Sequence, residues 1–234
     1  MASQACTGCE STKHSSLSRR RDSKVYTGGL VRFIGDIHAD GAAYASAVAG
    51  VDESIQVGDL EIGIAREEDV RKWPCQPGSG HRFIRGNHDN PSVCRNHPLF
   101  IESGAEGDMF FVNGAWSIDQ DDREENKDWW PDEEHSQRDL DLLFEAWSNR
   151  RPRVMISHDC PWRVSQELFQ IIDYSPGPSR TARALQAMFD CHQPEVWVFG
   201  HWHKRRDQKI GATRFVCLER GGWIDIDLTV KTAP

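Results

Sequence analysis

The stretch that decides the fold reads Leu30-Val31-Arg32-Phe33-Ile34-Gly35-Asp36-Ile37-His38. Its first five residues predict a buried strand, because most of them are apolar, and Asp36 and His38 follow directly as the strand ends. The Ala-rich segment 42–49 comes next and predicts a helix, with Asp40 placed to cap its N-terminus. A strand followed directly by a helix begins a βαβ unit, so we expect an α/β fold.

Four later runs repeat this arrangement, in which Asp, Asn or His follows an apolar segment. They are Gly58-Asp59, Gly86-Asn87-His88-Asp89, Ser157-His158-Asp159 and Gly200-His201-Trp202-His203. The segments in front of them each predict a strand, at 54–57, 81–85, 153–156 and 195–199. Ligands of open α/β sheets bind outside the carboxyl ends of the strands, so we expect all five runs to converge at one edge.

The remaining elements are expected from the spacing of apolar residues. Helices are predicted at 66–73, 136–147 and 180–190. Alternation of apolar and polar residues predicts strands at 213–218 and 223–228. The segment 109–116 predicts a pair of strands hinged near Asn113-Gly114, a dipeptide that favours turns.

Length and charge limit the classes of protein to consider. The 234 residues are enough for one α/β domain with a large core. A formal net charge of −8 argues against broad electrostatic coating of nucleic acid, but it is compatible with a small phosphorylated substrate. No stretch approaches the roughly 20 apolar residues of a membrane span, and the N-terminus lacks the apolar core of a secretion signal. We therefore expect a soluble, cytoplasmic protein with no membrane partner.

Residues 1–24 differ from the rest of the chain in composition. They are rich in Ser, and their basic residues outnumber their acidic ones. Such a segment buries too little apolar surface to fold, so we expect a disordered tail at 1–24 and one folded domain at 25–234. Binding of nucleic acid or a partner by this basic tail is the alternative.

The five runs together offer Asp, Asn and His side chains, a mixture of oxygen and nitrogen donors. Imidazole adds affinity for Mn, Fe, Ni and Zn over Mg or Ca, so this mixture favours divalent transition-metal ions. Two such ions at roughly 3.5–4 Å need a bridging ligand. Asp59 is the best candidate, because it stands alone between runs that supply the other ligands. The sequence therefore predicts a two-metal site of the kind that hydrolyses phosphoesters.

The pattern G-D-x-H, G-D, G-N-H-E/D, H and G-H-x-H resembles that of the calcineurin-like metallophosphoesterase superfamily, over residues 30–228. The resemblance implies a four-layer α/β/β/α sandwich with two mixed β-sheets and a dinuclear metal site at the loop edge. It also implies that one metal is held by Asp36, His38 and His203, the other by Asn87, His158 and His201, and that Asp59 bridges both. His88 matches the residue that protonates the leaving oxygen or stabilises its charge.

The sequence departs from one branch of this superfamily, the Ser/Thr protein phosphatases. There the second motif continues as G-D-x-V-D-R-G, which supplies a carboxylate for the acid histidine and an arginine for the phosphate. Here Ile62 and Gly63 occupy those two positions, so we do not expect a protein phosphatase. Glu61 either orients His88 instead or is an exposed loop residue. Arg85 is either a phosphate contact or part of a structural ion pair.

Residues 119–134 form an acidic segment that contains Trp129-Trp130-Pro131. One interpretation is a solvated loop that leads into a helix, since acidic residues and Pro favour helix N-termini. The other is a lid over the metal site, in which Trp129 and Trp130 stack on a nucleobase or exclude water. Trp202 is open to either a core or a site role, because it lies between two of the expected ligands.

These features predict a metal-dependent phosphoester hydrolase in which an activated water attacks phosphorus in line. Phosphomonoesters or small phosphodiesters are the expected substrates, because the acidic body disfavours long polyanions. A nuclease or cyclic-nucleotide phosphodiesterase is the alternative, suggested by the Trp pair and the basic tail. A non-catalytic scaffold with the same sandwich is a third hypothesis, although all the metal-binding positions and His88 are present.

Overall fold

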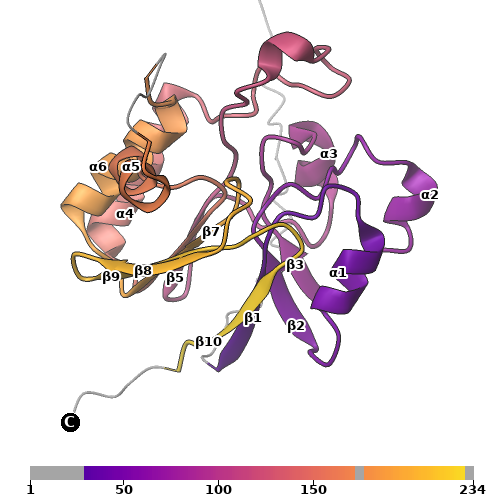
Figure 1. The fold of residues 1–234 in the computed structure, drawn as a ribbon, viewed down its shortest axis with the longest axis horizontal. Coiled ribbons are helices and arrows are strands. Elements are labelled where there is room, and N and C mark those ends of the chain that lie inside the picture. The colour runs from indigo at the N-terminus through magenta and orange to yellow at the C-terminus, as the bar shows by residue number, and fades with distance from the viewer. Residues whose placement is uncertain (1–28, 172–176, 230–234) are drawn as a thin grey trace, which may run out of the picture.

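The computed structural model describes residues 29–171 and 177–229. The expected tail at 1–24 lies outside these residues, so its disorder stays a prediction. Two sheets stand face to face in the centre of the molecule, with helices on both outer faces (Figure 1). Among the described residues, none of the helices is long and apolar enough to cross a membrane.

The first sheet has the strand order β10-β1-β2-β3. Its strands are β1 (Leu30–Ile34), β2 (Glu53–Gln56), β3 (Gly80–Phe83) and β10 (Trp223–Asp227). The first three strands run parallel, and β10 pairs antiparallel with β1. The carboxyl ends of β1, β2 and β3 therefore lie at the same edge of this mixed sheet.

The second sheet has the order β4-β5-β6-β7-β9-β8. Its strands are β4 (Gly104–Glu106), β5 (Met109–Val112), β6 (Val154–Ser157), β7 (Val196–Phe199), β8 (Arg206–Ile210) and β9 (Thr213–Cys217). The four central strands are parallel, whereas β4 and β8 pair antiparallel at the two edges. This sheet is mixed as well.

Helices cover the outer face of each sheet, so the expected four-layer α/β/β/α sandwich is confirmed. Three short helices lie on the side of the first sheet: α1 (Gly41–Ala47), α2 (Glu67–Val70) and α3 (Pro91–Asn96). Three longer ones lie on the side of the second: α4 (Gln137–Arg150), α5 (Trp162–Phe169) and α6 (Arg180–Cys191). The side chain of Asp40 caps α1 as expected, by accepting a hydrogen bond from the backbone N–H of Ala43.

The strands of the second sheet are apolar on both faces because both faces are covered. In β5, Met109 and Phe111 point into the core between the two sheets, while Phe110 and Val112 point into the core under α4, α5 and α6. All four side chains are buried. Continuous apolar runs of this kind are typical of strands enclosed on both sides.

The structure corrects the expected strand pair at 109–116. Strand β5 ends at Val112, and its antiparallel partner is β4, which precedes it. The turn thus lies at Gly107-Asp108 and not at Asn113-Gly114. The Asn113 side chain instead bonds to neighbouring loops: its Oδ1 accepts from Arg85 N at 2.7 Å and its Nδ2 donates to Ile101 O at 3.0 Å.

The acidic segment 119–134 is also not simply a solvated loop leading into a helix. It contains only a short 3-10 helix, η1 (Gln120–Asp122), and α4 begins after it with Ser136 as its N-cap. Glu133 is buried and accepts hydrogen bonds from Ser117 N and Oγ, at 2.8 and 2.5 Å. Glu134 is buried as well and accepts from Thr181 N, in the first turn of α6, at 2.8 Å. These carboxylates tie the segment to the body of the protein.

Candidate metal centre

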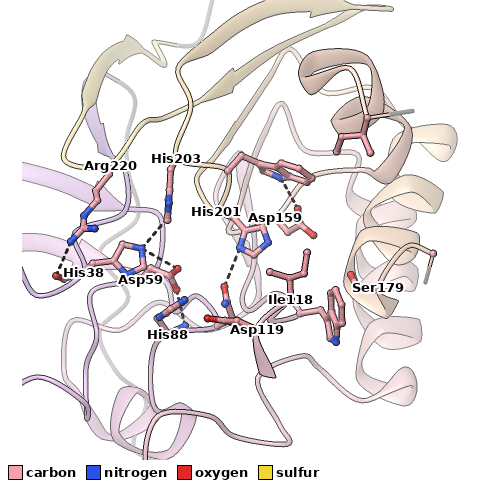
Figure 2. A pocket seen from close by; sticks show the side chains of 15 residues that line it. His38, Asp59, His88, Ile118, Asp119, Asp159, Ser179, His201, His203 and Arg220 are labelled. Carbon is pink, nitrogen blue, oxygen red and sulfur yellow. Dashed lines mark hydrogen bonds and ion pairs between the residues drawn. The ribbon is translucent and has the colours of Figure 1, made fainter. Parts of the chain in front are cut away.

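The five runs converge at one edge of the sandwich, between the two sheets. Asp36 follows β1, Asp59 follows β2, Asn87 follows β3, His158 follows β6 and His201 follows β7. Within each sheet these five strands run parallel to one another, so their carboxyl ends meet there. A cavity of about 640 Å³ opens beside them, and His38, Asp59, His88, His201 and His203 line it (Figure 2).

One group of donor atoms comprises Asp36, His38, Asp59 and His203. One ligand atom from each lies within 4.8 Å of every other. His203 Nε2 is 3.0 Å from Asp36 Oδ2, and His38 Nε2 is 3.7 Å from Asp59 Oδ2. The Nε2 atoms of His38 and His203 are 2.9 Å apart. The structure thus brings together the three side chains expected at the first metal, with Asp59 beside them.

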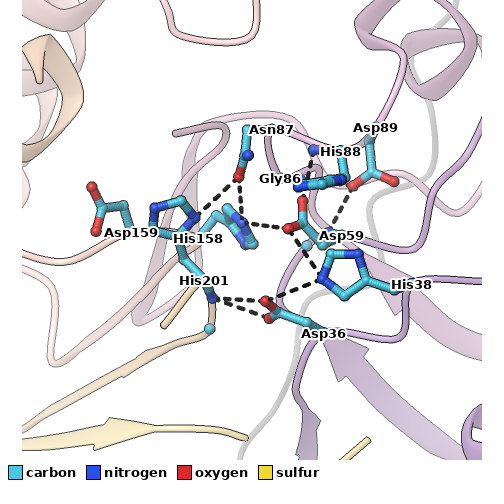
Figure 3. A network of polar contacts seen from close by, with 12 residues as sticks. Asp36, His38, Asp59, Gly86, Asn87, His88, Asp89, His158, Asp159 and His201 are labelled. Atoms are coloured by element: carbon cyan, nitrogen blue, oxygen red, sulfur yellow. Dashed lines mark hydrogen bonds and ion pairs between the residues drawn. The ribbon is translucent and has the colours of Figure 1, made fainter. Parts of the chain in front are cut away.

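A second group comprises Asp59, His158 and His201, again within 4.8 Å of one another. The Asn87 carboxamide joins it, because its Oδ1 lies 3.1 Å from His158 Nε2 and 3.0 Å from His201 Nδ1 (Figure 3). The Asn87 Nδ2 donates to Ser117 Oγ at 3.0 Å, which turns the amide oxygen toward the site. Asp59 belongs to both groups, as a bridging ligand must.

The donor set suits divalent cations, because lone pairs face one another across it. His158 Nδ1 donates to the carbonyl of Val57 at 2.8 Å, so in the neutral ring Nε2 carries a lone pair. That atom faces two further acceptors, Asp59 Oδ2 at 3.3 Å and Asn87 Oδ1. A histidine that ligates a metal commonly donates its other N–H to a backbone carbonyl in this way.

Without a bound cation, the electrostatic interactions among the donor groups also favour positive charge at the site. Burial alone lowers the pKa of His158, but the Asp59 carboxylate overrides this and raises it to about 10. Burial likewise raises the pKa of Asp59, but the charge and hydrogen bond of His158, together with the charges of His88 and His38, outweigh burial, so the net direction is downward. A buried carboxylate among imidazoles therefore holds its negative charge and draws a proton or a cation to the site.

Two glycines of the runs are required by close approach. A Cβ on Gly200 would overlap Asp36 Oδ1, and a Cβ on Gly86 would overlap Asp59 Oδ1. Any other residue would push these carboxylates away from the imidazoles. This explains why Gly precedes the metal-binding residue types in these two motifs.

Comparison with known families decides the identity of this centre. Residues 30–205 match the model of the calcineurin-like phosphoesterase family. The chain belongs to this family. Its members hydrolyse phosphoester bonds, and the expected resemblance is confirmed. No curated protein matches the chain.

One solved structure agrees in fold, the TT1561 protein of Thermus thermophilus. It is 13% identical, with a TM-score of 0.50 over 86% of this chain and 99% of that one, and at this identity the likeness concerns the fold alone. The phosphopantetheinyl hydrolase PptH of Mycobacterium tuberculosis is also similar to this chain, at 15% identity and a TM-score of 0.43 over 83% of this chain and 91% of its own.

Asp89, the last residue of the G-N-H-D motif in this phosphoesterase, braces the two loops that carry Asp59 and Asn87. Its Oδ2 accepts from the backbone N–H groups of Asp59 and Gly86 at 2.9 and 2.8 Å, and its Oδ1 accepts from Ile62 N at 3.0 Å. Burial and the nearby Asp59 charge raise the pKa of Asp89 to about 6. Through these hydrogen bonds, Asp89 positions the residues that are expected to bind metal.

His88 lies beside both groups. Its backbone N–H donates to Asp59 Oδ1 at 2.8 Å, and its ring centroid is 4.7 Å from that of His38. Burial is the main cause that lowers the pKa of His88, and the positive charge of Arg123 adds to it. The ring is therefore neutral at pH 7 and accepts a hydrogen bond from the guanidinium.

Arg123 is the residue at this site that the sequence interpretation missed. Its Nη2 lies within hydrogen-bond distance of both ring nitrogens of His88, 3.1 Å from Nδ1, and it donates to Asp119 Oδ2 at 2.8 Å. The Arg123 side chain is only 7% exposed. Since Ile62 and Gly63 leave out the Asp and Arg of the protein phosphatase motif, a search for another Asp–Arg pair could have found Asp119 and Arg123.

Three residues expected to contact substrate lie elsewhere. Arg85 is buried and donates to the carbonyls of Glu133 and Asp132, at 2.5 and 3.1 Å, so its contacts are structural. Trp130 is also buried, and neither it nor Trp129 lines the cavity. The Trp pair therefore does not form a lid over the site, which was the second of the two interpretations of this segment. Glu61 contacts His38 Nδ1, at 3.2 Å, instead of orienting His88.

Proposed function

We propose that this phosphoesterase hydrolyses phosphomonoesters or small phosphodiesters with two divalent transition-metal ions, for which manganese is the first choice to test. One observation carries the proposal: two groups of donors, each suited to one cation, share the single carboxylate of Asp59. The net charge of −8 supports a small phosphorylated substrate over a long polyanion.

The side chains divide into holding and reacting roles. Asp36, His38 and His203 would hold one ion, and Asn87, His158 and His201 the other. When bound, such ions neutralise phosphate charge and make a water molecule acidic enough to ionise near neutral pH. Asp59 would fix the spacing of the two positions, and Asp89 keeps Asp59 in place through its backbone N–H.

His88 is the group proposed to act on the leaving oxygen. A neutral imidazole has one N–H to donate and one nitrogen that accepts, and Arg123 Nη2 can donate only to the nitrogen that accepts. Donation to the leaving oxygen stabilises the charge that develops there, an effect worth roughly 10²- to 10⁴-fold for a positioned acid. The non-catalytic scaffold is disfavoured, because the full donor set and His88 lie together at one cavity.

The proposal is tested on full-length protein loaded with Mn²⁺. We expect hydrolysis of p-nitrophenyl phosphate, of bis(p-nitrophenyl) phosphate, or of both. Asp59→Asn should abolish the activity and reduce bound metal while the circular dichroism spectrum is kept. Asp207→Asn is the matched control, since Asp207 forms an exposed ion pair with Arg214 away from the site. Metal-loaded protein that is inactive on both esters, or an Asp59→Asn variant with an unchanged rate, contradicts the proposal.

A further inference from the structure

The cavity beside the metal centre has two chemically different ends (Figure 2). The imidazoles and carboxylates described above form one end. The apolar side chains of Trp116, Ile118, Ile171 and Trp202 line the other, together with the polar residues Asp159 and Ser179. Its volume of about 640 Å³ lies within the roughly 300–1,000 Å³ of sites for drug-sized ligands, so it is far larger than a phosphate group requires.

Trp202 is held rigidly at the junction of the two ends. One face of its indole stacks on Phe169, with ring centroids 4.5 Å apart and an interplanar angle of 11°. Its Nε1 donates to Asp159 Oδ1 at 3.0 Å, and Asp159 is itself buried. Both contacts fix the plane of the indole, and Trp202 is among the residues that line the cavity. Its ring also meets that of His201 edge to face, with ring centroids 5.9 Å apart.

Ile118 provides apolar surface that packing does not explain. Its side chain is 85% exposed, the highest value among the large hydrophobic residues that are exposed in the described chain. It lines the same cavity as Trp116 and Trp202. An apolar patch exposed inside a functional cavity commonly marks a surface that a ligand covers.

We infer that the substrate carries a planar ring on the alcohol side of its phosphoester, and that this ring packs on Trp202 between the apolar side chains of Ile118 and Trp116. The substrate class is then a nucleotide or an aryl phosphoester. This inference rests on the proposed hydrolysis, because the metal end must hold the phosphate. A flat, immobilised indole favours a flat partner, since stacking buries area on both rings at little cost in side-chain entropy.

Two pairs of ligands test how much a planar ring contributes to binding. AMP and ribose 5-phosphate share the phosphate and the sugar, and differ in the base. Phenyl phosphate and cyclohexyl phosphate share the ring size, and differ in planarity. Dissociation constants are measured by calorimetry on Mn²⁺-loaded full-length protein in which His88→Asn slows hydrolysis.

We expect AMP to bind roughly 5- to 150-fold more tightly than ribose 5-phosphate, the effect of stacking one base on an aromatic side chain. Phenyl phosphate should bind more tightly than cyclohexyl phosphate if a planar ring is what Trp202 selects. Preference in the first pair alone assigns a nucleotide, and preference in both assigns any aromatic ring. Equal affinities within both pairs overturn the inference.

Variants then locate the effect. Trp202→Ala should bring the AMP to ribose 5-phosphate ratio to within about twofold of one, whereas Trp202→Phe should retain most of it. Because Trp202 adjoins two of the proposed ligands, Ile118→Ser provides a second test, which should lower the ratio without loss of bound metal. Leu142→Ser, at a 56% exposed position on α4, is its control. An unchanged ratio in both Trp202→Ala and Ile118→Ser overturns the inference.

Failure of the inference and failure of the proposed function are distinguishable. Hydrolysis of the p-nitrophenyl esters by the unmodified protein tests the metal chemistry, whatever the binding ratios are. An active enzyme that shows no preference for planar rings contradicts the inference alone. An inactive enzyme contradicts the proposed function, and with it the assignment of any bound ring to a substrate.

Discussion

Arg123 gives the sharpest test of the proposed role of His88 as the acid. Its side chain is 7% exposed, and its guanidinium reaches His88, Asp119 Oδ2 at 2.8 Å and Asp128 O at 3.2 Å. Arg123→Met keeps the length of the side chain but removes every donor. A hydrogen bond to a charged group contributes about 1.5–3 kcal/mol. If the bond to His88 is needed in the transition state, its loss lowers kcat/KM by roughly 10- to 150-fold.

The assay measures kcat and KM for a p-nitrophenyl ester on the Mn²⁺-loaded variant. Because Arg123 contacts His88 and does not line the cavity, we expect the loss in kcat, with KM within about threefold of its original value. Lys127→Met is the control. It removes a positive charge from the same loop, where Lys127 forms an ion pair with Glu124 in which both side chains are 70% exposed. Such a pair contributes at most about 1 kcal/mol.

Two results would refute this reasoning. The first is an Arg123→Met enzyme that has full metal content and a kcat/KM within twofold of the original. That result would mean that Arg123 only stabilises its loop. An equal loss in Lys127→Met would show that the charge of the loop matters and not the contact with His88. Arg123→Lys should lie between the two, because one ammonium cannot reproduce the fork of a guanidinium.

Three further predictions concern the support of the site. Gly200→Ala should abolish metal binding, because the new Cβ would displace Asp36. Gly80→Ala is the control: its Cβ would be equally crowded, but against the backbone at Asp52, so it should lower stability and leave the metal content unchanged. Metal analysis distinguishes the two variants. Arg85→Met should leave two carbonyls unpaired and lower Tm by more than about 4 °C, with the specific activity of the folded enzyme retained. Burial lowers the pKa of His135 to about 4, below its value of 6.5 in the unfolded chain. Between these two pH values the unfolded state therefore binds more protons than the folded state. The free energy of unfolding is consequently lost as the pH falls from about 6.5 toward 4. His135→Gln should remove up to about 3 kcal/mol of this pH dependence, and parallel Tm curves for the two proteins would contradict it.

The sequence was informative wherever local pattern and burial coincide. The strands in front of Asp36, His158 and His201 are short, mostly apolar runs, and each is largely buried in a sheet that helices or a second sheet cover. The polar residues then follow where the chain leaves the core. Parallel strands carry such residues to one edge, so both the fold and the convergence of the site could be predicted.

Other elements carry no such local signal. Strand β8 (Arg206–Ile210) has mostly exposed, charged or polar side chains, because it is an edge strand, so no alternation of apolar residues marks it. The burial of Glu133 and Glu134 depends on partners in other segments, Ser117 and Thr181. Composition therefore predicted a solvated segment, and the tertiary contacts overrode it.

The residue missed at the site has the same cause. Arg123 stands 35 positions from His88 and within an acidic segment whose composition indicated solvent exposure. For Trp202 the sequence left a core role and a site role open, because its contact with Phe169 depends on how α5 packs. The Trp129-Trp130 pair was the more conspicuous signal, yet Trp130 is buried and neither indole lines the cavity.

Backbone strain is concentrated at the residues that carry the donors. His38, Asp59, His201 and His203 have φ values of 47°, 61°, 64° and 52°, in the left-handed region that costs a non-Gly residue roughly 1–2 kcal/mol. Hydrogen bonds offset this cost at two of them, since His38 N donates to Asp59 O at 2.9 Å and His201 N donates to Asp36 Oδ2 at 3.0 Å. These sharp turns directly after the strands point side chains from distant segments at one place. Strain of this kind persists only where surrounding structure over-determines it, and it clusters at functional sites. The geometry that suits two cations is thus built into the loops themselves.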